Sequence, residues 1–131
     1  MSSFFSQHFN APTPWSFPVR KVREQQIKQI VEKVTLETSG ETLIVAGDLN
    51  LNWNDPEDLS LLEAFSNDLE LKDSLKGIQA ERGWPILDYI LYRNGKATFL
   101  EVLEAGEDIS FKYEKRPLSD HPALFLKIRV N

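Results

Sequence analysis

The chain has 131 residues, of which 41% are hydrophobic and 27% charged, values typical of one soluble globular domain and too few residues for two. Fifteen Lys and Arg residues against twenty Asp and Glu residues give a net charge of −5, which argues against tight non-specific binding to nucleic acid. No run of about 18 apolar residues and no secretory leader occurs, so we expect a cytoplasmic protein without a membrane span.

The first third of the chain predicts a strand, a helix and a second strand. Residues 4–9 are expected to form a short strand, and the prolines of residues 11–18 argue for an extended loop instead of a helix. Apolar residues recur at helical spacing over residues 19–34, which predicts an amphipathic helix. After a turn at Gly40, the aliphatic and β-branched run of residues 42–46 predicts a buried strand.

The rest of the chain predicts one more helix and several strands. Asp55-Pro56 combines a capping residue with a proline at the first helical position, which marks a helix start. Asn94-Gly95 is a hairpin signal and predicts that the strand at 86–92 pairs with residues 97–103. Further short strands are expected at residues 69–74, around Phe111 within a polar loop over 106–116, and at 123–130. The fold class is therefore α/β, a mixed β-sheet with helices on one face, and residues 1–131 form a single domain.

Gly47-Asp48-Leu49-Asn50 follows the buried strand directly and is the first candidate for chemistry. Side chains two residues apart in an extended segment share a side, so Asp48 and Asn50 are expected to lie together at the end of the strand. A carboxylate there can activate a water molecule, and an amide can donate to an oxyanion. The alternative is a turn in which both side chains bond their own backbone.

A second pair of motifs places a carboxylate near an imidazole. Asp88 lies within the apolar run Ile86-Leu87-Asp88-Tyr89-Ile90-Leu91, where a carboxylate needs a partner, and Ser119-Asp120-His121-Pro122 precedes the last strand. We expect His121 to pair with Asp88, which would hold the imidazole in one tautomer. Asp120 and His121 point to opposite sides of an extended segment, so one of them could bind a cation while the other reaches a phosphate or a second carboxylate. A purely structural role for His121 remains the alternative.

Other candidates carry less weight. His8 precedes the proline-rich loop and either opens onto the site or is a loop residue of no consequence. Trp53, like Trp15 and Trp84, either rims a substrate groove or packs a loop onto the core. Arg23 is either exposed or tied to a neighbouring strand. The chain contains no cysteine, so any metal would have oxygen or imidazole ligands, as Mg²⁺, Mn²⁺ and Ca²⁺ do.

Taken in order, these motifs make the chain similar to the endonuclease/exonuclease/phosphatase (DNase I-like) superfamily, to the carboxyl-terminal half only. The matching stretches cover nearly the whole chain and are His8-Phe9-Asn10-Ala11-Pro12, Arg23-x-x-Gln26, Gly47-Asp48-Leu49-Asn50, Leu87-Asp88-Tyr89-Ile90-Leu91 and Ser119-Asp120-His121-Pro122. The first two resemble most closely the bacterial members of this superfamily. The resemblance implies a hydrolase that acts on phosphoesters and uses Mg²⁺, with Mn²⁺ or Ca²⁺ as alternatives.

The resemblance also implies a role for each matched residue. Asp48 would activate the attacking water, and Asn50 would hold the phosphoryl oxygens. His121, oriented by Asp88, would contact the scissile phosphate. Asp120, together with Asp48, would bind the cation. His8 would support the leaving-group side. The resemblance leaves the substrate open between nucleic acid and a phospholipid headgroup.

The chain departs from the family in one respect. The family fold is a sandwich of two packed sheets about twice as long as this chain. The strand with the family's Asn and the segment with its metal-binding Glu are absent, since Glu101, Glu104 and Glu107 lie in the wrong part of the chain. We therefore expect an incomplete cation site and an exposed apolar sheet face.

Three interpretations of that departure remain open. The chain requires a missing amino-terminal half, or it pairs with itself as a homodimer, or it is a non-catalytic module that recognises phosphate.

Overall fold

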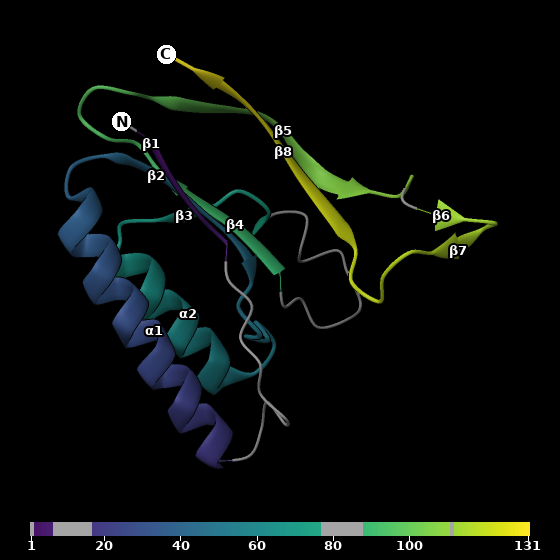
Figure 1. Ribbon diagram of the computed structural model, residues 1–131, viewed down its shortest axis with the longest axis horizontal. Helices are drawn as coiled ribbons and strands as arrows, with labels where there is room; N and C mark the ends of the chain where they lie inside the picture. Colours follow the sequence, from purple (N-terminus) through teal and green to yellow (C-terminus); the bar gives the residue numbers. More distant parts are fainter. Residues whose placement is uncertain (1, 7–16, 77–87, 111) are drawn as a thin grey trace.

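A four-stranded mixed sheet forms the centre of the fold in the computed structural model, which describes residues 2–6, 17–76, 88–110 and 112–131 (Figure 1). Its strands lie in the order β1-β2-β4-β3. β1 runs parallel to β2, whereas β4 is antiparallel to both β2 and β3. The strand bounds are Ser2–Ser6 for β1, Thr42–Asp48 for β2, Lys72–Asp73 for β3 and Asp88–Arg93 for β4.

Two helices cover one face of this sheet (Figure 1). α1 (Phe17–Thr38) buries Ile27 and Val34 on the side that faces the sheet. α2 (Pro56–Asp68) begins after Asp55, whose carboxylate accepts hydrogen bonds from the first free N–H groups of the helix. These helices pack because their apolar residues recur at helical spacing and so gather on one side.

The alternation of side chains along β2 decides which face the helices cover. Leu43 and Val45 are buried in the same core cluster as the helix residues, together with Leu91 of β4. Ile44 and Ala46, which point to the other face, are only half-buried. The second face of the sheet is therefore apolar but incompletely covered.

What covers that second face is a two-stranded antiparallel ribbon, formed by β5 (Leu100–Asp108) and β8 (Ala123–Val130). This β5–β8 ribbon lies on the side of the four-stranded sheet away from the helices (Figure 1). Leu124 of β8 lines a pocket of about 250 Å³ together with Ala46 and Ile90 of the sheet. The layers are thus helices, sheet and ribbon, and the ribbon brings the segment before β8 to one end of the sheet.

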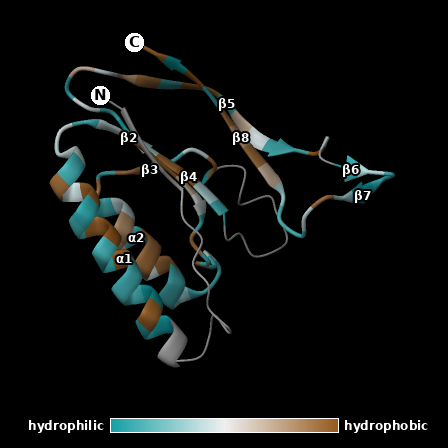
Figure 2. Cartoon of the chain, viewed as in Figure 1, coloured by the Kyte–Doolittle hydropathy of each residue, from teal (hydrophilic) through white to brown (hydrophobic). Residues whose placement is uncertain are grey.

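Beyond the ribbon, a short hairpin of β6 (Lys112–Tyr113) and β7 (Arg116–Pro117) forms an exposed arm. Its two turn residues, Glu114 and Lys115, have positive φ angles of 48° and 66°. Figure 2 shows β6 and β7 as largely hydrophilic, in contrast to the apolar stretches of β8.

One pairing that the sequence predicts is wrong. β4 pairs with β2 and β3, not with residues 97–103, and the chain after Asn94-Gly95 leaves the sheet to enter the ribbon. Gly95 is required by close approach and not by a hairpin turn: a Cβ there would lie 2.4 Å from the backbone nitrogen of Thr42. The Asn94 side chain accepts a hydrogen bond from the N–H of Leu100, which fixes the change of layer.

The proline-rich segment also ends earlier than predicted, since α1 begins at Phe17 and includes Pro18. Proline is tolerated there because the N–H groups of the first turn have no partner within the helix. β1 ends at Ser6, and β5 extends through Asp108 into the expected loop. The strand at 123–130 and the helix start at Asp55-Pro56 are confirmed, whereas the strand expected around Phe111 lies partly outside the described residues.

The predicted fold class, a mixed α/β sheet with helices on one face, is confirmed. Neither α1 nor α2, the helices of the described part of the chain, carries an apolar stretch long enough to cross a membrane.

Candidate functional site

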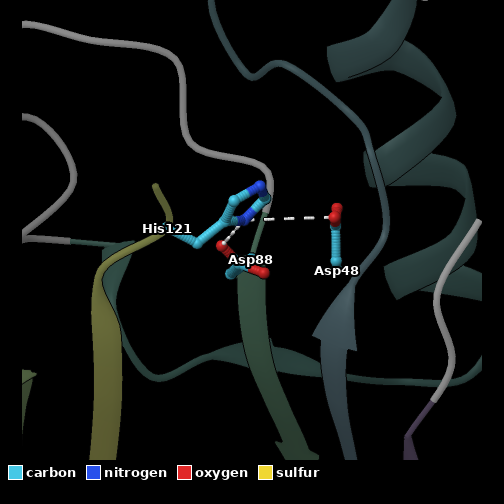
Figure 3. A group of neighbouring side chains, drawn as sticks. All are labelled: Asp48, Asp88 and His121. Atoms are coloured by element: carbon cyan, nitrogen blue, oxygen red, sulfur yellow. Dashed lines mark hydrogen bonds and ion pairs between the residues drawn. The ribbon is translucent and has the colours of Figure 1, made fainter. Parts of the chain in front are cut away.

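Asp48, Asp88 and His121 meet at one end of the sheet (Figure 3). Asp48 ends β2 and Asp88 begins β4, and the antiparallel register places the two residues directly opposite each other. His121 comes from the ribbon layer, two residues before β8. Its Nδ1 atom lies 2.6 Å from Oδ2 of Asp88 and 4.0 Å from Oδ2 of Asp48. The predicted pairing of His121 with Asp88 is therefore present.

Local backbone features explain how each side chain reaches this position. Gly47 has a φ of +144°, in a region that favours glycine, and β2 continues through it to Asp48, which is still paired with β4. The N–H of His121 donates to Oγ of Ser119, which closes a tight turn ahead of β8. The site thus combines the ends of two paired strands with a turn from another layer.

The environment of His121 favours its charged form. The hydrogen bond with Asp88 raises the pKa of His121 most, and the charges of Asp88, Asp48 and Asp120 raise it further, whereas partial burial opposes them. Since an ionised carboxylate only accepts hydrogen bonds, we assign the proton on Nδ1 to the bond with Asp88. The other ring nitrogen, Nε2, takes no part in that bond.

The two carboxylate oxygens of Asp48 have different neighbours. Oδ1 accepts a hydrogen bond from the N–H of Asn50 at 2.8 Å, while Oδ2 faces His121. The turn interpretation considered from the sequence is thus correct for one oxygen, and the other belongs to the cluster. Asn50 adopts a left-handed conformation with φ of 53°, which Asn tolerates better than most residues.

Asp48, Asp88 and His121 could together hold a metal ion, because one possible ligand atom from each lies within 4.8 Å of the others. Among the described residues, no other group of three or more His, Asp or Glu side chains meets this condition. Two carboxylates and an imidazole suit Mn²⁺ and, with added water ligands, Mg²⁺. The fit has one condition. Nδ1 of His121 already bonds Asp88, so a cation that used Nδ1 would displace that bond, whereas a cation held by Asp48 alone would preserve it.

The other described residues that were predicted for the site do not belong to this cluster. Asp120 is exposed and lies outside this cluster, and its role as a cation ligand stays a prediction. Trp53 is half-buried and packs against the hydrophobic core, which is the packing role that the sequence left open. Its contact with substrate also stays a prediction. His8, Trp15 and Trp84 lie outside the described residues.

A pocket of about 520 Å³ adjoins the cluster on the ribbon side. Asp120 and His121 form part of its wall, and Lys112 of the arm contributes a cation. Apolar walls come from Ile109 and Leu118, both mainly exposed to solvent. The imidazole therefore borders open space on the ribbon side.

Three residues near the site were not assigned a function from the sequence. Arg23, Asp58 and Tyr89 are buried and contact the loop that follows Asp48. The signal for Arg23 was present, because it shares a helix side with Ile27, which is buried. Asp58 in the first turn of a helix and Tyr89 in a strand carry no such signal, since both are ordinary in those places.

Comparison with known proteins shows structural similarity alone. No family model and no curated protein sequence matches the chain. The catalytic domain of human Nocturnin, solved with a bound sulfate anion, matches with a TM-score of 0.69 at 25% identity, over 96% of this chain and 46% of that chain. A humanized TDP2 of D. rerio matches with a TM-score of 0.62 at 17% identity, over 98% of this chain and 52% of that chain. The chain thus spans about half the length of these solved structures.

Proposed function

Because the chain has the DNase I-like (endonuclease/exonuclease/phosphatase) fold over about half the length of its solved neighbours, we propose that it is a metal-dependent phosphoester hydrolase domain. The observation that carries the proposal is the Asp88–His121 pair at 2.6 Å, with Asp48 opposite Asp88 in the strand register. This arrangement has a water-activating carboxylate, an oriented imidazole and an adjoining pocket. The sulfate in the Nocturnin structure is a tetrahedral oxyanion, like phosphate.

In the proposed mechanism, His121 binds the phosphoryl group. Asp88 holds the proton on Nδ1, so Nε2 faces away from Asp88, and the imidazolium form can donate from it to a phosphoryl oxygen. The raised pKa of His121 keeps that donor protonated over a wider pH range. Charge that develops on the phosphoryl oxygens is thereby stabilised.

Asp48 and Asn50 act on the other participants in the reaction. Oδ2 of Asp48 lies at the end of the sheet beside His121, where the carboxylate would accept a proton from an attacking water. The Asn50 amide would donate to a phosphoryl oxygen. A bound divalent cation, held by Asp48 and Asp120, would supply Lewis-acid stabilisation of the same charge.

We also propose that a second polypeptide segment completes the site. The second face of the sheet is covered by a ribbon of only two strands, and Ile44 and Ala46 on that face are half-buried. Both long edges of the ribbon are available for pairing in the described structure, and such edges recruit further strands. A missing amino-terminal half or a second copy of the chain would meet this need.

We propose a phosphodiester as the substrate class, without choosing between two sources. A nucleic acid or a phospholipid headgroup each presents a phosphodiester, and the net charge of −5 disfavours non-specific nucleic acid. The second candidate function is a non-catalytic module that recognises phosphate. It is favoured by the position of Asp120 outside the cluster, which leaves fewer cation ligands in place.

A magnesium titration separates the two functions. We expect Mg²⁺ or Mn²⁺ to raise the unfolding temperature of the wild-type chain, and this rise to disappear in Asp48→Asn, because binding to the native state alone stabilises it. Absence of any cation effect on the wild type would favour the binding module. Hydrolysis of a generic aryl phosphodiester by the isolated monomer, abolished by Asp48→Ala, would contradict the need for a second segment. The native mass in solution identifies a monomer.

A further inference from the structure

Side chains from three different elements form hydrogen bonds with the backbone of the loop after β2, at residues 50–52. Arg23 of α1 donates to the carbonyl of Asn50, and the hydroxyl of Tyr89 in β4 donates to the carbonyl of Leu51 at 2.5 Å. The carboxylate of Asp58 in α2 accepts from the N–H of Asn52 at 3.1 Å. Three consecutive residues are therefore each fixed by a side chain from a different element.

These three side chains are buried more deeply than the site they surround. The exposed fractions are 0% for Arg23, 3% for Asp58 and 1% for Tyr89. Arg23 and Asp58 also form an ion pair of 3.1 Å between Nη2 and Oδ1. A buried ion pair is rarely more stabilising than apolar residues of the same volume, because both charges lose their hydration. A contribution to the free energy of unfolding therefore does not by itself account for the Arg23–Asp58 ion pair.

Burial raises the pKa of Tyr89 most, and the neighbouring charges of Asp73, Asp58, Asp88 and Asp48 raise it further, so its hydroxyl stays protonated and remains a donor well above neutral pH. Tyr89 also follows Asp88 directly in β4, so the strand that carries the partner of His121 holds the loop as well.

The loop needs such support because of Asn50. This residue has a φ of 53°, a conformation that is about 1 kcal/mol less favourable than the usual one for a residue with a Cβ. Its N–H bonds Asp48 and its carbonyl bonds Arg23, so both peptide groups of Asn50 are fixed. Without these bonds, the loop would relax and the backbone of Asn50 would leave this conformation.

We propose that Arg23, Asp58 and Tyr89 are positioning residues, which hold Asn50 and Asp48 in the geometry needed to bind a phosphoryl group. The proposal rests on the phosphoester function proposed above. All three side chains are buried, and each would act through the backbone of residues 50–52 and not by touching substrate.

The first test uses Tyr89→Phe, which removes one hydroxyl and keeps the buried ring. Amide hydrogen exchange of Asn50 and Asn52 should accelerate roughly five-fold, the effect of one lost hydrogen bond on local opening, while amides of the β2–β4 ladder keep their wild-type rates. Ser74→Ala is the matched control, because it also removes one hydroxyl that donates to a backbone carbonyl, that of Ile90. Wild-type exchange at both loop amides in Tyr89→Phe would overturn the proposal.

The second test replaces the ion pair by apolar residues in Arg23→Met/Asp58→Leu. Because this variant also loses the bonds to the backbone of Asn50 and Asn52, we expect a lowered denaturation midpoint and an increase in amide exchange that is larger at Asn50 and Asn52 than in the β2–β4 ladder. If the pair served stability alone, exchange at the loop amides and at the ladder amides would accelerate by the same factor. If the double variant does not fold, Tyr89→Phe still decides the question.

The functional readout is binding of inorganic phosphate in the presence of Mg²⁺, followed at the side-chain amide signal of Asn50. We expect roughly ten-fold weaker binding in Tyr89→Phe and in the double variant, and unchanged binding in Ser74→Ala. Equal affinity in wild type and variants, with a loosened loop, would overturn the positioning role. No binding by the wild type would instead contradict the proposed function, so the two failures are distinguishable.

Discussion

Asp88→Asn changes the charge next to His121 without changing the shape of the side chain, and its effect on stability should depend on pH. The hydrogen bond of 2.6 Å joins an imidazole and a carboxylate whose side chains are 34% and 21% exposed. A charge-assisted hydrogen bond contributes 1.5–3 kcal/mol when it is shielded from water, and we reduce this to about 1 kcal/mol for the solvent screening at this site.

The sign of the effect follows from the direction of the pKa shift. The pKa of His121 is raised in the folded state, so its contribution to stability is fully present below the unfolded pKa of about 6.5 and is lost as the pH rises through the folded pKa. Above that pH the imidazole is neutral. Asp48 and Asp88 then face each other as like charges, an arrangement that destabilises a strand pair.

Asp88→Asn should therefore be less stable than the wild type by about 1 kcal/mol near pH 5.5, and as stable or more stable near pH 9. Urea denaturation at the two pH values measures both differences. An NMR titration of His121 should show a lowered pKa in the variant, and a His8→Gln background identifies the signal, since the chain has two histidines. A stability difference that is the same at both pH values would refute the reasoning.

The other two predictions concern a glycine and the loop. Gly95→Ala should destabilise the chain by about 3 kcal/mol, because its Cβ would lie within 2.4–2.8 Å of three backbone atoms in residues 40–42. Gly106→Ala is its control, since there the nearest atom is a side-chain carbon of Phe125 at 3.2 Å, and equal losses by urea denaturation would contradict the clash. Asn50→Gly should keep or raise stability by up to about 1 kcal/mol, because glycine adopts a positive φ freely, yet it should abolish phosphate binding. Retained phosphate affinity in a titration would show that the Asn50 amide takes no part.

The sequence predicts the positions of the acidic residues well, because those positions are set locally. A buried aliphatic run that ends in Gly47-Asp48 identifies a strand end, and the apolar neighbours of Asp88 identify a carboxylate that needs a partner. The pairing of Asp88 with His121 followed from that need, and the structure contains it.

Pairing between strands was harder to predict, since it depends on residues far apart in the chain. Asn94-Gly95 has the composition of a hairpin turn, but Gly95 is instead required by contact with the backbone of Thr42, a neighbour more than fifty residues away. Likewise, Asp58 and Tyr89 contact the loop after β2 only because α2 and β4 pack beside it. Such contacts arise from tertiary structure, and no local pattern records them.

The three residues of the cluster do not belong to one layer, and this affects when the site forms. Pairing of β2 with β4 is enough to place the two carboxylates opposite each other as like charges. The imidazole arrives only when the β5–β8 ribbon packs onto the sheet. Docking of the last strand therefore also supplies the charge that offsets part of the negative charge of the site, and a chain with an undocked ribbon would keep both carboxylates but lack the imidazole.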